Sequence, residues 1–238
     1  MSDKKTAIVT GASQGIGAGV VQAFLKEGYN VVATSRDVSR AFTASPTLVL
    51  IDGDIGRQET AANAVEAALQ HFGTIDVLVT NAGIFRTKPF TEFTTDDFNA
   101  LVSTNLLGFI YIAQLTVKQM LKQKSGNVVS ISAVLADQPI AGVNASVAMI
   151  TKGGLNTVIR SLAIEYAKEG IRFNAVAPGV VNTPMHENNP KGALKRLQPM
   201  GGIAEVKDIV DAVLYLAQAG QVTGEVLHVD GGSHAGRW

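Results

Sequence analysis

The sequence contains no cysteine in 238 residues. A disulfide framework and a thiolate nucleophile are both excluded, so any acid–base or covalent chemistry must come from other side chains. Since cysteine-free proteins occur in oxidising and in reducing compartments, this absence does not indicate a location.

The chain also lacks an excess of charge of either sign. Twenty Lys and Arg residues balance twenty Asp and Glu residues, and the formal net charge is zero. Proteins that bind nucleic acid or anionic membranes carry a basic patch or a positive net charge. We therefore expect no nucleic acid and no membrane among its partners.

Long apolar runs are missing as well. No run approaches the roughly 20 apolar residues that are needed to span a bilayer. The start, "MSDKKTAIVTG", passes directly into a strand pattern without the apolar region of a signal peptide. Both features favour a cytoplasmic location.

Apolar residues make up 46% of the chain, and 24 residues are glycine. This composition is typical of a globular α/β protein, and the length fits one large core. There are no repeats, low-complexity tracts or linker-like stretches. We expect residues 1–238 to form a single domain.

Short β-branched runs alternate with segments of helical period along nearly the whole chain. The runs lie at 6–11, 30–35, 47–54, 75–83, 126–132, 171–179 and 224–232, and the helical segments at 15–28, 58–72, 95–123, 146–169 and 205–219. This alternation predicts a doubly wound, seven-stranded parallel sheet flanked by helices. Ligands bind such sheets at the carboxyl ends of the strands, and we expect the irregular segment 182–202 to be a mobile loop over that site.

The stretch "TGASQGIG" follows the first strand and opens the first helix. Gly11, Gly15 and Gly17 have a spacing that allows a tight turn and the close approach of a pyrophosphate to a helix N-terminus. A glycine triplet alone is weak support for nucleotide binding.

Further motifs follow the glycine turn in a fixed order: "NAG" at 81–83, "STNLLG" at 103–108, Lys152, and "PGVVNTP" at 178–184. Together they resemble the short-chain dehydrogenase/reductase family over residues 5 to 232. The resemblance implies a single-domain Rossmann fold and a nicotinamide dinucleotide. It implies the following cofactor-binding residues: Gly11, Ser13, Gln14, Gly15, Ile16, Gly17, Ser35, Arg36, Asp54, Ile55, Asn81, Ala82, Gly83, Lys152, Pro178, Gly179, Val181 and Thr183.

The end of the second strand bears on which dinucleotide is bound. An acid at this position bonds the ribose 2′-hydroxyl in dinucleotide-binding domains, whereas a basic residue accommodates a 2′-phosphate. Here Ser35 is followed by Arg36, which predicts NADP(H) in preference to NAD(H). Gln14, where many NADP-preferring relatives carry a base, and Asp37 beside Arg36 argue in the other direction.

In the family, a tyrosine exchanges the proton of the substrate oxygen. A lysine lowers its pKa, a serine polarises the same oxygen, and an asparagine holds a water near the lysine. Lys152 and Asn105 match the lysine and the asparagine, but Ala148 and Ala133 occupy the tyrosine and serine positions. The other tyrosines do not qualify: Tyr166, for example, lies 14 residues beyond Lys152, about 21 Å along a helix.

Several groups remain as replacements for the phenol. Ser132 and Ser146 supply hydroxyls, His186 titrates in a useful range, and Lys152 could act through a water filling the space beside Ala148. The candidate catalytic residues are therefore Lys152, Asn105, Ser132 and His186, and no metal ligands are predicted. The long span from 133 to 148 and the context "ASVAMITKGG" favour natural divergence over introduced Ala133 and Ala148.

Three functions stay open at this point. The first is an NADP(H)-dependent oxidoreductase with an atypical proton donor, acting on a small molecule. The second is an NADP(H)-binding sensor or partner subunit without redox turnover, and the third is a lyase or isomerase using the same pocket. Lys152, Asn105 and Thr183 favour the first, because a pure binder has no use for Asn105.

The segments 95–123 and 146–169 carry more apolar residues than one buried stripe requires. In the family, the corresponding helices make a dimer contact. We expect a homodimer or homotetramer. We expect the substrate to be determined by the segments around 85–93, 134–145 and 182–202.

Overall fold

The computed structural model describes residues 4–236 and contains one parallel sheet of seven strands. The strand order is β3-β2-β1-β4-β5-β6-β7. The strands are β1 (Thr6–Thr10), β2 (Asn30–Ser35), β3 (Leu48–Asp52), β4 (Val77–Thr80), β5 (Gly126–Ile131), β6 (Ile171–Pro178) and β7 (Val226–Val229). The predicted fold class is confirmed, although most of the runs extend past the observed strands because their last residues turn into the loops.

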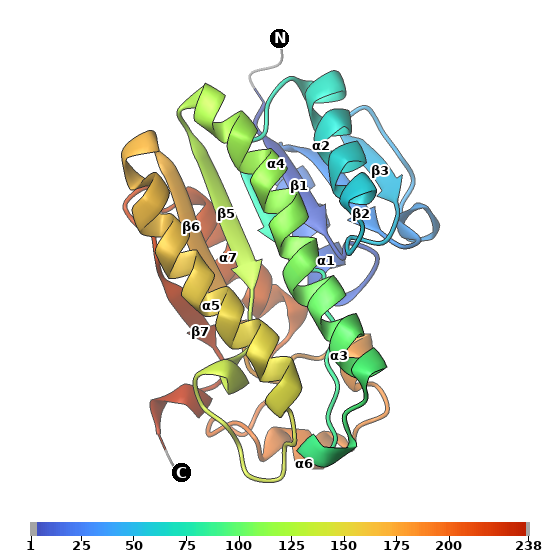
Figure 1. Ribbon diagram of the computed structural model, residues 1–238, viewed down its shortest axis with the longest axis vertical. Coiled ribbons are helices and arrows are strands. Elements are labelled where there is room, and N and C mark those ends of the chain that lie inside the picture. The colour runs from blue at the N-terminus through green and yellow to red at the C-terminus, as the bar shows by residue number, and fades with distance from the viewer. Residues whose placement is uncertain (1–3, 237–238) are drawn as a thin grey trace.

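Helices cover both faces of the sheet (Figure 1). They are α1 (Gly15–Lys26), α2 (Gln58–Phe72), α3 (Thr95–Val102), α4 (Gly108–Gln123), α5 (Ser146–Tyr166), α6 (Lys191–Lys195) and α7 (Val206–Gln218). Side chains of α2, α4 and α5 form one core with one face of the sheet, and those of α1 and α7 form a second core with the other face. This three-layer arrangement buries the strands on both sides, which explains their continuous Val, Ile and Ala runs.

The helix predicted over 95–123 is interrupted. A π-helical turn, Ser103–Leu107, joins α3 to α4 and contains the buried Asn105. Single π-turns inside helices are frequent at functional sites. Residue spacing alone did not reveal this turn.

Thr95–Gln123 is long and apolar enough to cross a membrane by length and composition, and it is the one such helix among residues 4–236. This differs from the expectation that the sequence holds no stretch of that kind. Its inner side packs Ile112, Val117 and Met120 into the core. The core helix of a soluble protein meets the same criteria, so the finding is weak support for a membrane span.

The order of the strands reverses between β1 and β4, which lie side by side at the centre of the sheet. Their carboxyl ends point toward the end of the molecule that holds α6 and the C-terminal turn (Figure 1). In open α/β sheets, ligands bind in the crevice at such a reversal. The segment 182–202 lies at this end and includes α6, so it is more regular than the sequence predicts.

Candidate active site

A cavity of about 670 Å³ opens at the carboxyl ends of the strands. Ligand pockets for small molecules and cofactors usually measure about 300–1,000 Å³. With one exception, Gly17, every residue that the resemblance assigned to the cofactor lines this cavity: Gly11, Ser13, Gln14, Gly15, Ile16, Ser35, Arg36, Asp54, Ile55, Asn81, Ala82, Gly83, Lys152, Pro178, Gly179, Val181 and Thr183. The fold therefore gathers the predicted set in one place.

Gly17 packs against the backbone of Gly11 in the glycine turn. A Cβ added to Gly17 would lie 2.2 Å from the carbonyl oxygen of Gly11, so only glycine lets α1 pack this closely on the turn. The side-chain amide of Asn81 holds the turn from the other side, donating to the carbonyl oxygens of Thr10 and Gly11 at 3.0 Å. The N-cap residue of α1, Gln14, makes no side-chain cap hydrogen bond, so the first N–H groups of the helix can bind phosphate.

The adenosine end of the cavity is formed where β2 and β3 finish. The hydroxyl of Ser35 is buried and, among the described residues, has no hydrogen-bond partner. Arg36 and Asp37 border the cavity beside it. Asp54 also lines this end, and its carboxylate accepts a hydrogen bond from the backbone N–H of Gly56 at 2.9 Å.

Lys152, on the first turns of α5, borders the centre of the cavity. Its ammonium donates a hydrogen bond to the carbonyl oxygen of Ile131, the last residue of β5, at 2.8 Å. Burial lowers the pKa of Lys152 to about 8, because a desolvated ammonium is disfavoured. A Cβ added to Gly83 would lie 3.1 Å from this ammonium nitrogen, so glycine makes room for it.

Asn105 does not line the large cavity. Its amide donates to the carbonyl oxygen of Ile84 at 3.1 Å and to the Thr151 hydroxyl at 2.9 Å, and its Oδ1 accepts from the N–H of Ile84 at 2.9 Å. It borders a separate cavity of about 10 Å³ together with Thr10, Thr80 and Lys152. A polar cavity of this size holds about one water molecule. Asn105 thus fixes the backbone at Ile84, in the segment after β4. It shares only the small cavity with Lys152.

Ala148, at the position of the family tyrosine, is fully buried and does not border the cavity. It belongs to an apolar cluster with Leu101 and Val147, against which Ile84 and Phe85 pack. Its methyl group therefore lies among apolar side chains, and the structure offers no support for the expected water beside it.

Ala133 and Ser132 both line the cavity. They follow directly after β5, which ends at Ile131. The Ser132 hydroxyl is directed to the carbonyl oxygen of Lys152 at 3.4 Å. It steadies the start of α5 in this way.

His186 lines the cavity from the short turn Pro184–His186, as predicted for a substrate-side residue. Ser146 is exposed at the start of α5 and does not border the cavity. No tyrosine lines the cavity, in agreement with the sequence argument. Among residues 4–236, no group of three or more His, Asp or Glu side chains could hold a metal ion.

The end of the cavity away from the glycine turn is mainly apolar, and we call it the apolar end. It is lined by Phe85, Val134, Leu135, Ile140, Val143, Met185, Leu194 and Leu197. The sequence located this region only as the segments around 85–93, 134–145 and 182–202.

An ion-pair cluster that the sequence did not reveal anchors the loop bearing Phe85. The buried carboxylate of Asp97 accepts hydrogen bonds from Arg86, Lys88 and both the N–H and the hydroxyl of Thr94. The hydrogen bond from Lys88 and that from the Thr94 backbone hold the pKa of Asp97 well below its usual range. Only the capping-box pattern of Thr94 and Asp97 was a visible signal for it.

Comparisons with known proteins agree with this geometry. A family model described as "Enoyl-(Acyl carrier protein) reductase" matches residues 11–234. The 3-oxoacyl-[acyl-carrier-protein] reductase of Bos taurus is 33% identical over 232 residues, covering 96% of this chain and 97% of the relative. The 3beta-hydroxysteroid dehydrogenase 1 of Eggerthella lenta is 33% identical over 244 residues, covering 96% and 93%.

Solved structures give the same result. ElxO with NADP bound superposes with a TM-score of 0.90 at 29% identity, covering 98% of this chain and 100% of that one. The 3-ketoacyl-(acyl-carrier-protein) reductase of Brucella melitensis complexed with NADH has a TM-score of 0.90 at 30% identity, covering 97% and 98%. The matches run over nearly the whole chain and include the glycine turn and Lys152. The protein belongs to the short-chain dehydrogenase/reductase family of nicotinamide-dependent oxidoreductases.

Proposed function

We propose that this chain is an NADP(H)-dependent oxidoreductase that interconverts a small carbonyl compound and its alcohol, with Lys152 instead of a tyrosine serving the substrate oxygen. When bound, the nicotinamide supplies or accepts the hydride. The observation that carries the proposal is the Lys152 ammonium, buried beside the cavity with a pKa of about 8. A general acid works best when its pKa lies near the working pH.

The surroundings of Lys152 support a proton-transfer role. Its bond to the Ile131 carbonyl oxygen fixes the ammonium while leaving its other protons available. The small cavity shared with Asn105 has room for a water that can return a proton to Lys152. His186 borders the same large cavity and is the second candidate for a proton donor.

A preference for NADP(H) is supported by Arg36 at the cavity wall, directly after the end of β2. A guanidinium donates hydrogen bonds to a phosphate and matches its charge. Asp37 also borders this end and opposes an anion.

The second candidate is an NADP(H)-binding protein without redox turnover, or a lyase or isomerase that uses the same pocket. It is favoured by one observation, the absence of both hydroxyls at Ala133 and Ala148. Loss of one positioned acid typically lowers a rate by about 10²–10⁴, which leaves measurable turnover if the substrate is well oriented.

One experiment separates these functions. Cofactor affinity is measured by fluorescence titration with NADPH, and turnover is measured as NADPH oxidation with a panel of ketones and aldehydes. The native chain, Lys152→Met and Ala148→Tyr are compared. We expect the native chain to bind NADPH and to oxidise it with at least one carbonyl compound. We expect Lys152→Met to lose this turnover. NADPH binding with turnover in Ala148→Tyr alone points to the second candidate.

We further propose that the protein forms a homodimer or homotetramer through α4 and α5 and acts in the cytoplasm. Ile110, Ile150 and Ile164 on these helices are 39%, 55% and 81% exposed. Large apolar side chains gathered on helix surfaces are typical of contact faces. Light scattering of the purified protein tests the assembly, and a monomeric mass would contradict it.

A further inference from the structure

The apolar end of the cavity carries little charge. Among the described residues that line the cavity, the ionisable side chains are Arg36, Asp37, Asp54, Lys152 and His186. The first three belong to the adenosine end, and Lys152 borders the centre. His186, next to Met185, is then the one ionisable side chain of the lining at the apolar end. A substrate carboxylate or phosphate placed there would meet neither a Lys nor an Arg.

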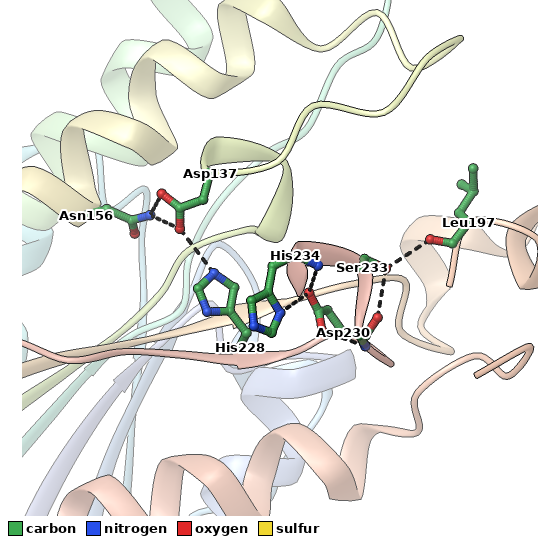
Figure 2. Close-up of polar contacts among 8 residues, drawn as sticks. Asp137, Asn156, Leu197, His228, Asp230, Ser233 and His234 are labelled. Carbon is green, nitrogen blue, oxygen red and sulfur yellow. Dashed lines mark hydrogen bonds and ion pairs between the residues drawn. The ribbon is translucent and has the colours of Figure 1, made fainter. Parts of the chain in front are cut away.

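The apolar end also offers few hydrogen bonds. The Ser233 hydroxyl lies within hydrogen-bond distance of the carbonyl oxygens of Leu197 and Asp230, at 3.0 and 2.8 Å, so it is already used (Figure 2). Thr87 and Asn189 also line the cavity, but both are exposed residues that water can reach. A substrate with many hydroxyl groups would lose its hydration at this end without replacement, which costs binding free energy.

One segment of the wall is fixed by a polar contact behind it. Residues 134–143 supply Val, Leu and Ile side chains to the apolar end. Within this segment, the carboxylate of Asp137 accepts a hydrogen bond from the Asn156 amide of α5 at 3.2 Å (Figure 2). The same carboxylate lies 3.1 Å from Nε2 of His228 in β7. Asp137 thus joins this segment to a helix and to a strand.

The neighbouring segments are fixed as well. The backbone N–H of Lys88 donates to the carbonyl oxygen of Asn144 at 3.0 Å, which joins the loop after β4 to the end of the first segment. The buried side chain of Gln198 donates to the carbonyl oxygen of Val180 at 2.8 Å, which holds the chain that follows α6. The apolar end is therefore preformed, and an apolar ligand would fill it without first ordering its walls.

We propose that the apolar end binds the hydrocarbon chain of an uncharged carbonyl substrate, and that the length of this chain sets the affinity. The proposal rests on the proposed function in taking the cavity beside Lys152 as the reaction site. Burial of each further methylene in a preformed apolar pocket strengthens binding about two- to fourfold. Polyols and keto acids are then poor substrates, because the lining replaces neither their hydration nor their charge.

The first test measures binding without turnover. It uses the full chain saturated with NADP⁺, because a ketone binds this complex without being reduced. The ligands are butan-2-one, hexan-2-one and octan-2-one, with L-erythrulose as the trihydroxy form of butan-2-one and 7-oxooctanoate as octan-2-one with a terminal carboxylate. Each is titrated while the methyl signals of Leu135, Leu197 and Leu214 are followed by NMR.

We expect Kd to fall about two- to fourfold with each added methylene, with shifts at Leu135 and Leu197 but not at Leu214, which does not line the cavity. L-erythrulose should bind no more tightly than butan-2-one, and 7-oxooctanoate at least about tenfold more weakly than octan-2-one. An affinity that stays the same from butan-2-one to octan-2-one would overturn the proposal. Tighter binding of L-erythrulose or of 7-oxooctanoate than of octan-2-one would overturn it too.

Variants of the wall test the assignment to these residues. Leu135→Asn places an amide in the wall at similar volume, and Val143→Thr adds one hydroxyl with the same shape. Both should weaken octan-2-one binding, Leu135→Asn about tenfold or more, and change butan-2-one binding less than about threefold. Leu214→Asn, at a half-buried leucine of α7, is the matched control and should bind octan-2-one like the native chain. Native affinity for octan-2-one in both wall variants would contradict the assignment.

A kinetic arm keeps this proposal separate from the proposed function. With NADPH, KM should fall with chain length in the same ratio as Kd, while kcat changes less than about threefold. If the ketones bind as described and none is turned over, the proposed function fails and the apolar end remains a site for hydrocarbon chains. Turnover with a KM that does not depend on chain length overturns the present proposal alone.

Discussion

The ammonium of Lys152 lies 2.8 Å from the carbonyl oxygen of Ile131, so the second turn of α5 is bonded directly to the last residue of β5. The contact places a buried amine at the edge of the large cavity, beside the fully buried Ala148 that stands at the tyrosine position. Lys152 therefore lines the cavity, whereas Ala148 does not.

The rate of carbonyl reduction should follow the protonation of Lys152. Only the ammonium can donate a proton, and its pKa is about 8. We expect kcat/KM for NADPH-dependent reduction to be constant below about pH 7 and to fall roughly tenfold per pH unit above 8. A pH–rate profile measures this, and a profile that rises through pH 8 would exclude Lys152 as the acid.

Lys152→Met should stabilise the protein while abolishing activity. The folded-state pKa of Lys152 is about 8 against a model value of 10.5, so unfolding takes up a proton between these values and native stability rises with pH across this window. At pH 7 the buried ammonium costs up to about 3 kcal/mol. The hydrogen bond to Ile131 offsets part of this, and we expect the variant to gain about 1–3 kcal/mol at pH 7. Denaturant melts at pH 7 and pH 10 measure it, and the gain should shrink at pH 10.

Ala148→Tyr should destabilise the chain. Ala148 is fully buried with Leu101 and Val147, and a phenol at this position overfills the cluster. We expect a loss of about 1–3 kcal/mol in the free energy of unfolding. Ala133→Ser, at the cavity wall, is the control and should change it by less than about 0.5 kcal/mol. Equal stability of Ala148→Tyr and the native chain would mean that room for a phenol remains there.

Asp97→Asn should loosen the loop that carries Phe85. The carboxylate bonds Arg86, Lys88 and Thr94, and its pKa is lowered in the folded state. Its contribution to stability is present above the unfolded-state pKa of about 3.9 and is lost as the pH falls below that value. Thermal melts should show a lower Tm for the variant at pH 7 and a smaller difference from the native chain near pH 3. The exposed Asp211→Asn, in a surface pair with Lys207, is the control.

Arg36→Ala should weaken NADPH binding about tenfold or more and leave NADH binding within about twofold, because only NADPH carries the 2′-phosphate that the guanidinium would contact. Fluorescence titration with both dinucleotides measures the ratio. Arg57→Ala, at an arginine that does not line the cavity, is the control. An unchanged NADPH affinity in Arg36→Ala would contradict the predicted preference.

The alternation of short apolar runs with helical segments sufficed to predict the seven-stranded sheet, because local periodicity decides which face of each element is buried. The sequence also predicted a binding site at one edge of the sheet, formed by the glycine turn, the "NAG" motif, Lys152 and Thr183. Parallel strands bring their carboxyl ends to the same side whatever the loops do.

Local spacing did not predict the side-chain directions beyond the strand ends. The Ser132 hydroxyl, just beyond the end of β5, is directed to the carbonyl oxygen of Lys152, 20 positions along the chain. The π-turn at Ser103–Leu107 placed Asn105 against Ile84 and Thr151, away from the large cavity. Such placements depend on how several elements pack at once.

The sequence by itself determined the fold, the cofactor edge and the absence of a tyrosine where the family has one, since each of these depends on residues close together in the chain or in a fixed order. Only the tertiary structure decided that Ala148 is sealed among apolar side chains and that His228 meets Asp137, 91 positions away. Contacts over such separations arise from the packing of whole layers, and no periodicity in the chain encodes them.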